Sequence, residues 1–321
     1  MVDILLATYN GEKYIKEQIN SIIAQTYKNW RLIIHDDQSS DATVEESYKA
    51  ALACGGNSIQ YCGGKKQIHI TVNPQACRGA AANFMGLLQE ARGEYAMFCD
   101  QDDVWNCDKI EKTLKCMKKM EKKYGTDTPI LLYTDLAVVD DHLQLISSSF
   151  IEYMNLPRRS VMPRLLFQNN VTGCTVLMNR ALYKLLQEAR NSDQVVMHDH
   201  FAALTAAVLG KVGYLKEATI QYRQHGDNSV GASDAKSIAY LWKRYRQGKA
   251  AFRQELYRTM IQAAYFYELY EEKIKDQKIK KLIRQYSLLY QRKKRYRIFF
   301  YIKNHVIKYG WIRAVMQIIW G

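Results

Sequence analysis

The first two-thirds of the chain alternates short apolar segments with amphipathic ones, and this alternation restricts its fold more than any other feature. The apolar segments have the length of strands, whereas the intervening segments repeat their apolar residues at helical spacing. The first amphipathic segment, for example, carries isoleucine at positions 15, 19, 22 and 23. We expect strands over 3–8, 30–35, 68–72 and 95–99, and helices over 12–25, 41–54 and 79–91. This order predicts an α/β fold, a mostly parallel sheet covered by helices.

The pattern changes beyond Gly231, where the strand alternation stops. Residues 236–321 carry 21 basic and 5 acidic side chains, a balance of +16, whereas the preceding 235 residues balance at −2. The net charge of +14 therefore belongs to the C-terminal part. We expect an α/β domain over 1–232 and a basic, aromatic-rich region of two or three helices over 233–321, which would meet an anionic partner.

Several classes of protein are disfavoured by what the sequence lacks. The seven cysteines are odd in number and form no CxxC pair, which argues against a disulfide framework or a zinc knuckle and favours reduced thiols in the cytosol. The first residues read as a strand and not as a signal peptide, and no apolar run has the length of a membrane span. Neither GxGxxG nor GxxxxGK[ST] occurs, so a dinucleotide dehydrogenase and a P-loop ATPase are poorly supported.

Ligands of such sheets bind at the carboxyl ends of the strands, so the residues that follow each expected strand are candidates for a site. Tyr9 follows the first strand and can stack on a planar base, although, taken alone, it is better explained as a surface tyrosine in a tight turn. Asp37 follows the second strand and can accept a hydrogen bond from a pyrimidine N3–H, although aspartate is also a common turn residue.

Three carboxylates, those of Asp100, Asp102 and Asp103, follow the strand over 95–99. Like charges this close raise one another's pKa unless a cation lies among them. Hard oxygen ligands suit Mg²⁺ or Mn²⁺, which proteins commonly share with phosphate oxygens. We therefore favour a metal–diphosphate site over a solvated acidic turn.

Two later segments add polar side chains. Asp199 opens an apolar helix, where it is either an N-cap or a general base, and the residues alone favour neither role. Arg223 and His225 lie in a polar segment over 222–228 that can contact a phosphate or a metal. A lone histidine is more often structural, but the carboxylates upstream give His225 more weight.

Taken together, these segments resemble the motifs of family 2 glycosyltransferases with the GT-A fold, in the family's order, and are most similar to the bacterial rhamnosyltransferase branch. The resemblance covers roughly residues 2–229. Its motifs are ATYNGE at 7–12, DDQSSD at 36–41, DQDDVW at 100–105, HD at 198–199 and YRQHGDN at 222–228.

The resemblance implies a role for each matching position. Asp199 would be the catalytic base, and the segment 171–174 would lie on the acceptor side. The implied metal ligands are Asp100, Asp102, Asp103 and His225. The residues implied to bind the nucleotide-sugar are Ala7, Thr8, Tyr9, Asn10, Asp37, Asn83, Asp100, Gln101 and Arg223.

The implied activity is an inverting glycosyl transfer that depends on Mn²⁺ or Mg²⁺. A metal stabilises the leaving diphosphate, so one base is enough to draw the proton from the acceptor hydroxyl. The branch favours L-rhamnose from dTDP-rhamnose, moved to a lipid-linked glycan in bacterial surface polysaccharide synthesis, with a UDP-hexose donor as the alternative. A polyanion-binding module is the alternative from another class. It would leave these motifs unexplained, and the basic residues form no RNA-binding signature, so we expect no nucleic-acid partner.

The basic C-terminal region has three competing interpretations. The segments 292–301 and 311–320 fit an interfacial helix whose Lys and Arg meet anionic lipid while Trp and Ile enter the headgroup boundary. A homodimer contact or a solvated helical bundle would use the same residues. The first interpretation places the protein in the cytoplasm, peripheral at the inner face of the cell membrane.

Overall fold

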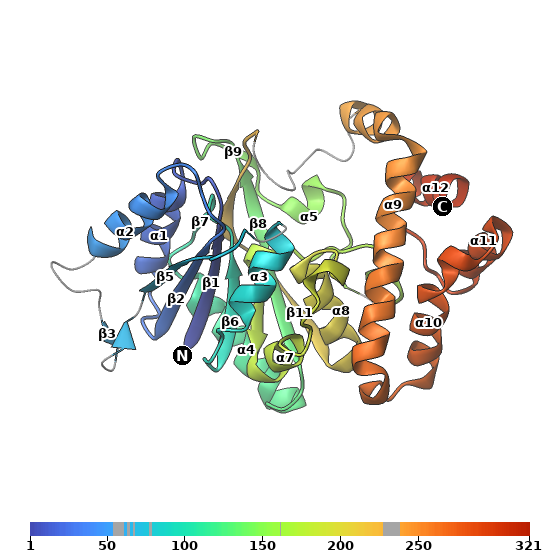
Figure 1. Cartoon of the computed structure of the whole chain (residues 1–321), viewed down its shortest axis with the longest axis horizontal. Helices are drawn as coiled ribbons and strands as arrows, with labels where there is room; N and C mark the ends of the chain where they lie inside the picture. Colours follow the sequence, from blue (N-terminus) through green and yellow to red (C-terminus); the bar gives the residue numbers. More distant parts are fainter. Residues whose placement is uncertain (54–60, 63–64, 67, 77–78, 161, 227–237) are drawn as a thin grey trace.

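The computed structural model describes residues 1–53, 61–62, 65–66, 68–76, 79–160, 162–226 and 238–321 (Figure 1). Its main feature is a nine-stranded sheet in the order β5-β2-β1-β6-β10-β8-β11-β7, with β9 paired to β8. The strands are β1 (Val2–Thr8), β2 (Trp30–Asp36), β5 (Ile68–Val72), β6 (Tyr95–Cys99), β7 (Val104–Trp105), β8 (Ile130–Val139), β9 (Leu145–Ser147), β10 (Leu177–Asn179) and β11 (Lys211–Arg223).

The sheet is mostly parallel, which confirms the expected fold. Strands β5, β2, β1 and β6 run in one direction, and β8 and β11 are parallel to each other. The short strand β10 is antiparallel to both β6 and β8, and β7 is antiparallel to β11. A separate two-stranded antiparallel sheet is formed by β3 (Tyr61–Cys62) and β4 (Lys65–Lys66).

Two apolar layers cover the sheet. Successive residues of β1 point to opposite faces, so that Ile4 and Leu6 join the layer under α1 (Ile15–Ile23), and Leu5 joins the layer that contains Phe84 of α3. The strand reads as a continuous apolar run because both of its faces are buried. The other helices of the body are α2 (Thr43–Ala53), α3 (Ala80–Leu88), α4 (Lys109–Tyr124), α5 (Phe150–Tyr153), α6 (Met162–Leu165), α7 (Arg180–Leu186) and α8 (His198–Leu209).

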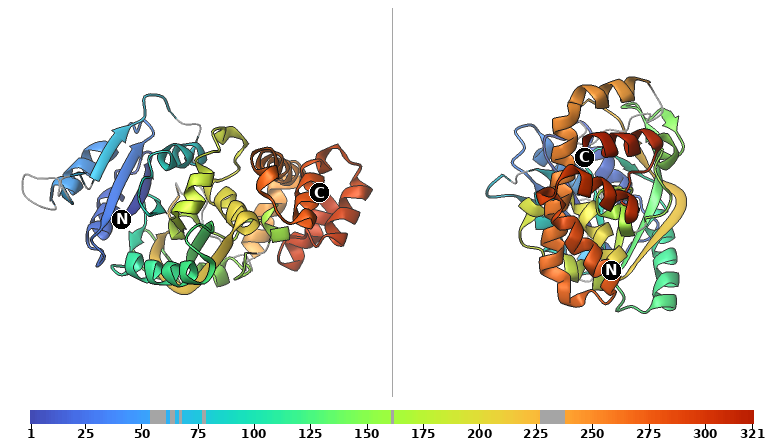
Figure 2. Two further views of the ribbon diagram at one scale, coloured as in Figure 1. Left: turned by 90° about the horizontal axis from the view of Figure 1, so that it is seen from below. Right: turned by 90° about the vertical axis from the view of Figure 1, so that its right-hand side faces the viewer.

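The described C-terminal residues form four helices, the longest of which is kinked at Gly248, and they lie together at one end of the molecule (Figure 2). This is one helix more than the largest number expected. They are α9 (Ile238–Tyr270), α10 (Gln277–Ser287), α11 (Lys294–Lys303) and α12 (Trp311–Trp320). Apolar spacing alone does not show where one helix ends and the next begins. Asp276 caps α10 by accepting the N–H groups of Lys278 and Ile279, and Gly310, at φ +91°, precedes α12.

The C-terminal helices share the core of the body. Phe201 of α8 lies 6.0 Å from Tyr265 and 6.1 Å from Phe266 of α9, measured between ring centroids. The hydroxyl of Tyr270 donates to the carbonyl of Leu185, 2.7 Å away. The nearly neutral body and the basic helices are therefore packed into one unit. In the described parts of the chain, no helix is both long and apolar enough to span a bilayer.

Candidate active site

The loops that follow β1 and β6 meet at the carboxyl edge of the sheet, because these strands are neighbours. Gln101 joins the two loops. Its Oε1 accepts the N–H of Tyr9 at 2.8 Å, and its Nε2 donates to the carbonyl of Tyr9 at 2.9 Å. A Cβ on Gly11 would lie only 2.4 Å from the amide carbon of Gln101, so this contact requires glycine at position 11. Tyr9 itself is exposed, with its ring available to a ligand.

The two adjacent aspartates at the end of β2 have different surroundings. Asp36 organises the edge, since its carboxylate accepts the hydroxyl of Thr8 at 2.9 Å and the N–H of Ser39 at 2.8 Å. Asp37 is largely buried, and its N–H donates to the carbonyl of Thr8 at 2.9 Å. Ala7, at the end of β1, is half-buried beside them. The structure thus brings Asp37 and the end of β1 together, as the sequence predicts.

Asn10 and Asn83 hold the surrounding loops. Asn10, at φ +47°, accepts the N–H of Ser40 at 2.9 Å. Asn83 is buried in α3, where its amide donates to the carbonyl of His35 at 3.2 Å and ties the helix to β2. Both side chains therefore have protein partners at the predicted donor edge.

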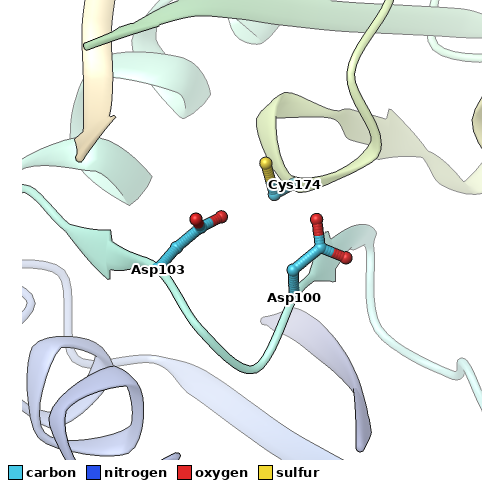
Figure 3. Close-up of side chains that lie close together, drawn as sticks. All are labelled: Asp100, Asp103 and Cys174. Carbon is cyan, nitrogen blue, oxygen red and sulfur yellow. The ribbon is translucent and has the colours of Figure 1, made fainter. Parts of the chain in front are cut away.

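Asp100, Asp103 and Cys174 form a compact cluster, with one ligand atom of each within 4.8 Å of the others (Figure 3). Asp103 is fully buried, and its Oδ2 has no hydrogen-bond partner among the described residues. Burial raises the pKa of Asp100 to about 7, with further contributions from Asp102 and Asp199, and it raises the pKa of Asp103 as well. A divalent cation would offset the repulsion between these carboxylates, so they fit a metal. Burial also raises the pKa of the Cys174 thiol, which keeps the thiol neutral.

Asp102 faces a different partner. Its Oδ2 lies 2.8 Å from Nε2 of His225, and the imidazole packs against the ring of Tyr14 at 4.7 Å. The four predicted metal residues are thus divided into two neighbouring pairs, Asp100 with Asp103 and Asp102 with His225. Asp227 and Asn228, the last residues of the motif that contains His225, lie outside the described residues.

Arg223, a predicted contact of the nucleotide-sugar, has several protein partners, and its contact with the donor stays a prediction. The side chain is buried, and its guanidinium forms an ion pair with Glu17 and donates to the carbonyl oxygens of Asp102 and Asp141. The backbone N–H of Arg223 donates to Asp103 at 3.2 Å. Arg223 therefore holds the carboxylate loop in place through these hydrogen bonds. Its protein partners come from segments far away in the sequence.

Asp199 lies at the start of α8 and is 9% exposed. Its Oδ1 accepts the amide of Asn169 at 3.0 Å and the N–H of His200. Burial raises its pKa to about 7, against the smaller opposing effect of the backbone N–H groups of His200, Gly173 and Asp199. It is also close enough for its charge to raise the pKa of Asp100. A carboxylate with a pKa near neutrality, beside the predicted diphosphate site, has the properties of a general base.

Lys109 is a buried cation that the sequence did not single out. Its Nζ donates to the carbonyl of Cys174 at 3.0 Å and lies 4.4 Å from the centre of the Trp105 ring. Burial lowers its pKa to about 8. The lysine looks like any other in the basic helix over 109–124, and only the fold places it behind the acidic cluster.

His198 is a second residue whose surroundings the sequence did not reveal. Its imidazole stacks on Phe84 at 3.9 Å and meets the edge of Phe98 at 4.6 Å. Neither ring nitrogen has a hydrogen-bond partner within the described ranges, and burial lowers the pKa of the ring to about 3. A neutral, apolar-packed histidine thus precedes Asp199.

Comparison with known proteins agrees with this geometry. The family model described as "Glycosyl transferase family 2" matches residues 3–212, which include the strand ends and Asp199. The chain belongs to glycosyl transferase family 2. It is therefore a glycosyltransferase, as the motifs predicted.

Among its relatives, the chain is 27% identical over 245 residues to "dTDP-rhamnosyl transferase RfbG" of Shigella flexneri, covering 71% of this chain and 74% of the relative. It is 28% identical over 183 residues to "UDP-Glc:alpha-D-GlcNAc-diphosphoundecaprenol beta-1,3-glucosyltransferase WfgD" of Escherichia coli, covering 57% and 61%. The fold is similar to that of S. aureus TarS 1-349, with a TM-score of 0.55 at 16% identity over 98% of this chain and 77% of the other.

Proposed function

We propose that this glycosyltransferase is an inverting, metal-dependent enzyme that transfers a sugar from a nucleoside diphosphate to an acceptor hydroxyl. One observation carries the proposal. Asp199, with its pKa near 7, lies beside a cluster of buried carboxylates at the edge where β2, β1 and β6 end. This arrangement combines a base with a site suited to a metal and a diphosphate.

The donor edge offers contacts for each part of a nucleotide. The exposed ring of Tyr9 can stack on the base, and the Asp37 carboxylate can accept the base N3–H. Asp100 and Asp103, with Asp102 and His225 beside them, would hold the metal. When bound, Mn²⁺ or Mg²⁺ would stabilise the negative charge of the leaving diphosphate.

The transfer itself needs one proton acceptor from the chain. The acceptor oxygen forms a bond to the anomeric carbon of the sugar while the bond from that carbon to the diphosphate oxygen breaks. The proton of the acceptor hydroxyl moves to Asp199, and the nucleoside diphosphate leaves as an anion. Because the displacement is single and in line, the configuration at the anomeric carbon inverts. Asn169 and the N–H of His200 hold the carboxylate in place.

For the donor, we propose dTDP-L-rhamnose first and a UDP-hexose second. RfbG is named as a dTDP-rhamnosyl transferase, and WfgD as a UDP-glucose-dependent enzyme acting on a diphosphoundecaprenol-linked sugar. Thymine and uracil both present an N3–H to Asp37, so this contact does not separate the two donors. We propose a lipid-linked glycan of a bacterial surface polysaccharide as the acceptor. A cytoplasmic location agrees with the free thiols of Cys99, Cys107, Cys116 and Cys174.

The proposal is tested by thermal shift and by release of nucleotide. We expect dTDP-rhamnose or UDP-glucose to raise the melting temperature more in the presence of Mn²⁺ than in its absence. Asp100→Asn should lose the metal-dependent part of the shift, whereas Asp127→Asn, which changes an exposed aspartate far from the site, should keep it. A metal-independent shift, or none with a panel of dTDP- and UDP-sugars, would count against the proposal.

A further inference from the structure

The helices α11 and α12 present large apolar side chains to solvent. Trp311 is 78% exposed, and the others are 46–58% exposed. We name this surface the lipid face; it comprises Phe299 and Ile302 of α11 and Trp311, Val315 and Ile319 of α12. Grouped exposed apolar side chains of this size mark an interaction surface.

The orientation of α12 is fixed by polar anchors on its inner side. Gln317 is buried, donating to the carbonyl of Val306 and accepting the N–H of Lys308, each at 2.8 Å. Arg313 donates to the carbonyls of Asn155 and Met154 at 3.0 and 2.9 Å. Trp311, Val315 and Ile319 recur every four residues and so form one stripe on the opposite side. This helix therefore turns an apolar stripe, and not a polar one, toward the solvent.

Basic side chains border the apolar ones. Lys303 lies 5.5 Å from the ring of Phe299, and Arg292 lies 5.6 Å from the ring of Tyr296, one turn earlier. Lys293 and Arg295 are exposed at the start of α11. Lys294 donates to the carbonyl of Ile319, so the basic start of α11 adjoins the end of the apolar stripe.

We propose that the lipid face docks on a membrane surface rich in anionic lipid. An interfacial helix needs apolar side chains that enter the headgroup boundary and cations that meet lipid phosphates, and α11 and α12, which adjoin at Lys294 and Ile319, carry both. The balance of +16 over 236–321 supplies the complementary charge. A second copy of the same face would bring equal charges together, which disfavours a symmetric dimer through this surface.

The lipid face is connected to the candidate base through the chain. The N–H of Tyr309, two residues before α12, donates to Gln168 at 2.7 Å. The next residue, Asn169, donates to Asp199 at 3.0 Å. In Figure 1, α12 lies in the upper half of the view, toward which β1 runs from the labelled N-terminus. If the proposed function holds, docking would place Asp199 near an acceptor that is anchored in the lipid.

Vesicle co-sedimentation of the full chain tests this proposal without any sugar-nucleotide, so its outcome is independent of the proposed function. We expect binding to vesicles that contain phosphatidylglycerol and little binding to pure phosphatidylcholine, with added salt weakening the binding. Replacing the stripe residues Trp311, Val315 and Ile319 by Ser should weaken binding at least tenfold. The matched control is Tyr48→Ser with Leu52→Ser, two exposed apolar residues one turn apart on α2, which should bind like the unaltered chain.

A second variant tests the charges while leaving the apolar stripe intact. Lys293→Glu with Arg295→Glu should reduce binding to anionic vesicles and weaken its salt dependence, and an unchanged circular dichroism spectrum would show that each variant is folded. Equal binding to neutral vesicles, or unchanged binding of both variants, would overturn the proposal. It would also be overturned if the chain bound RNA but not vesicles, or if the stripe variant only converted a dimer to a monomer.

Discussion

Burial controls how the aspartates of the site ionise. Asp199 and Asp100 both have a pKa of about 7, chiefly because their carboxylates are removed from water. The hydrogen bond from the backbone N–H of His200 favours the charged form of Asp199 but does not outweigh burial. Its carboxylate is consequently able to accept a proton near neutral pH.

The raised pKa of Asp199 predicts a pH-dependent stability. Its folded-state pKa of about 7 exceeds the ordinary 3.8. At pH values between these two, the folded state therefore holds a proton that the unfolded state has lost. Stability should fall as pH rises toward 7 and then level off. The free energy of unfolding of Asp199→Asn, measured relative to that of the unaltered chain, should therefore be about 3 kcal/mol higher at pH 8 than at pH 5.

Urea unfolding in metal-free buffer at both pH values measures this gain. Asp127→Asn, at an exposed position, is the matched control and should show no such change. A constant difference between the Asp199 variant and the unaltered chain at both pH values would mean that Asp199 ionises normally in the folded state.

Among single residues, the sequence identifies those whose type and spacing are already unusual without knowledge of the fold. Three carboxylates within four positions are difficult to explain without a cation, and the structure places two of them in one buried cluster. Lys109 was not predicted as part of this site because its importance comes only from neighbours distant in the chain. Cys174 lies in the segment 171–174 that the resemblance places on the acceptor side, but its closeness to the carboxylates could not be recognised from local sequence. The same is true of Glu17 and Asp141, the protein partners of Arg223.

Between elements, the close approach of the loop over 171–174 to α8 depends on Gly173. A Cβ at this position would lie 2.6 Å from Nε2 of His198. The imidazole cannot retreat easily, because it is packed against Phe84 and Phe98. The glycine therefore lets the loop approach the start of α8, where Asp199 lies.

Gly173→Ala should consequently destabilise the protein by about 1–3 kcal/mol, since the added methyl overpacks the contact with His198. Turnover should fall as well, because a displaced α8 start would move Asp199. Gly86→Ala is the matched control: a Cβ on this exposed helical glycine meets nothing within 4 Å. That change should stabilise the protein by about 0.5–1 kcal/mol, as judged by urea unfolding. A Gly173 variant as stable and active as the Gly86 variant would contradict the packing.

The elements themselves were predicted to different degrees. The strands over 3–8, 30–35, 68–72 and 95–99 agree with β1, β2, β5 and β6, because fully buried strands are continuous apolar runs bounded by polar turns. The number of C-terminal helices was underestimated, since helical spacing continues across their boundaries. Those boundaries depend on a cap at Asp276 and on the left-handed backbone of Gly310.

Over the whole molecule, the change in charge does not coincide with a division of the core. A single apolar cluster includes Phe201 of α8 together with Phe252, Phe266 and Tyr286 of the C-terminal helices. Composition predicts a domain over 1–232 and a helical region over 233–321, and this apolar cluster includes residues of both. Deleting the basic helices would expose the apolar side of α8.

Thermal unfolding should therefore show one cooperative transition for the whole chain, and residues 1–237 alone should be aggregation-prone. Calorimetry of the full chain tests the first expectation, and the solubility of the fragment on expression tests the second. Two separate transitions, or a soluble fragment that melts like the full chain, would show that the C-terminal helices fold independently.

The central claim is that Asp199 draws the proton from the acceptor. Asp199→Asn keeps an oxygen that accepts the hydrogen bonds of Asn169 and His200 but cannot take up the proton. Its turnover number should be measured with saturating donor, Mn²⁺ and a lipid-linked acceptor, beside its donor affinity and the Asp127→Asn control. We expect turnover to fall by about 10²–10⁴-fold while donor affinity is unchanged. Turnover close to that of the unaltered enzyme would contradict the claim.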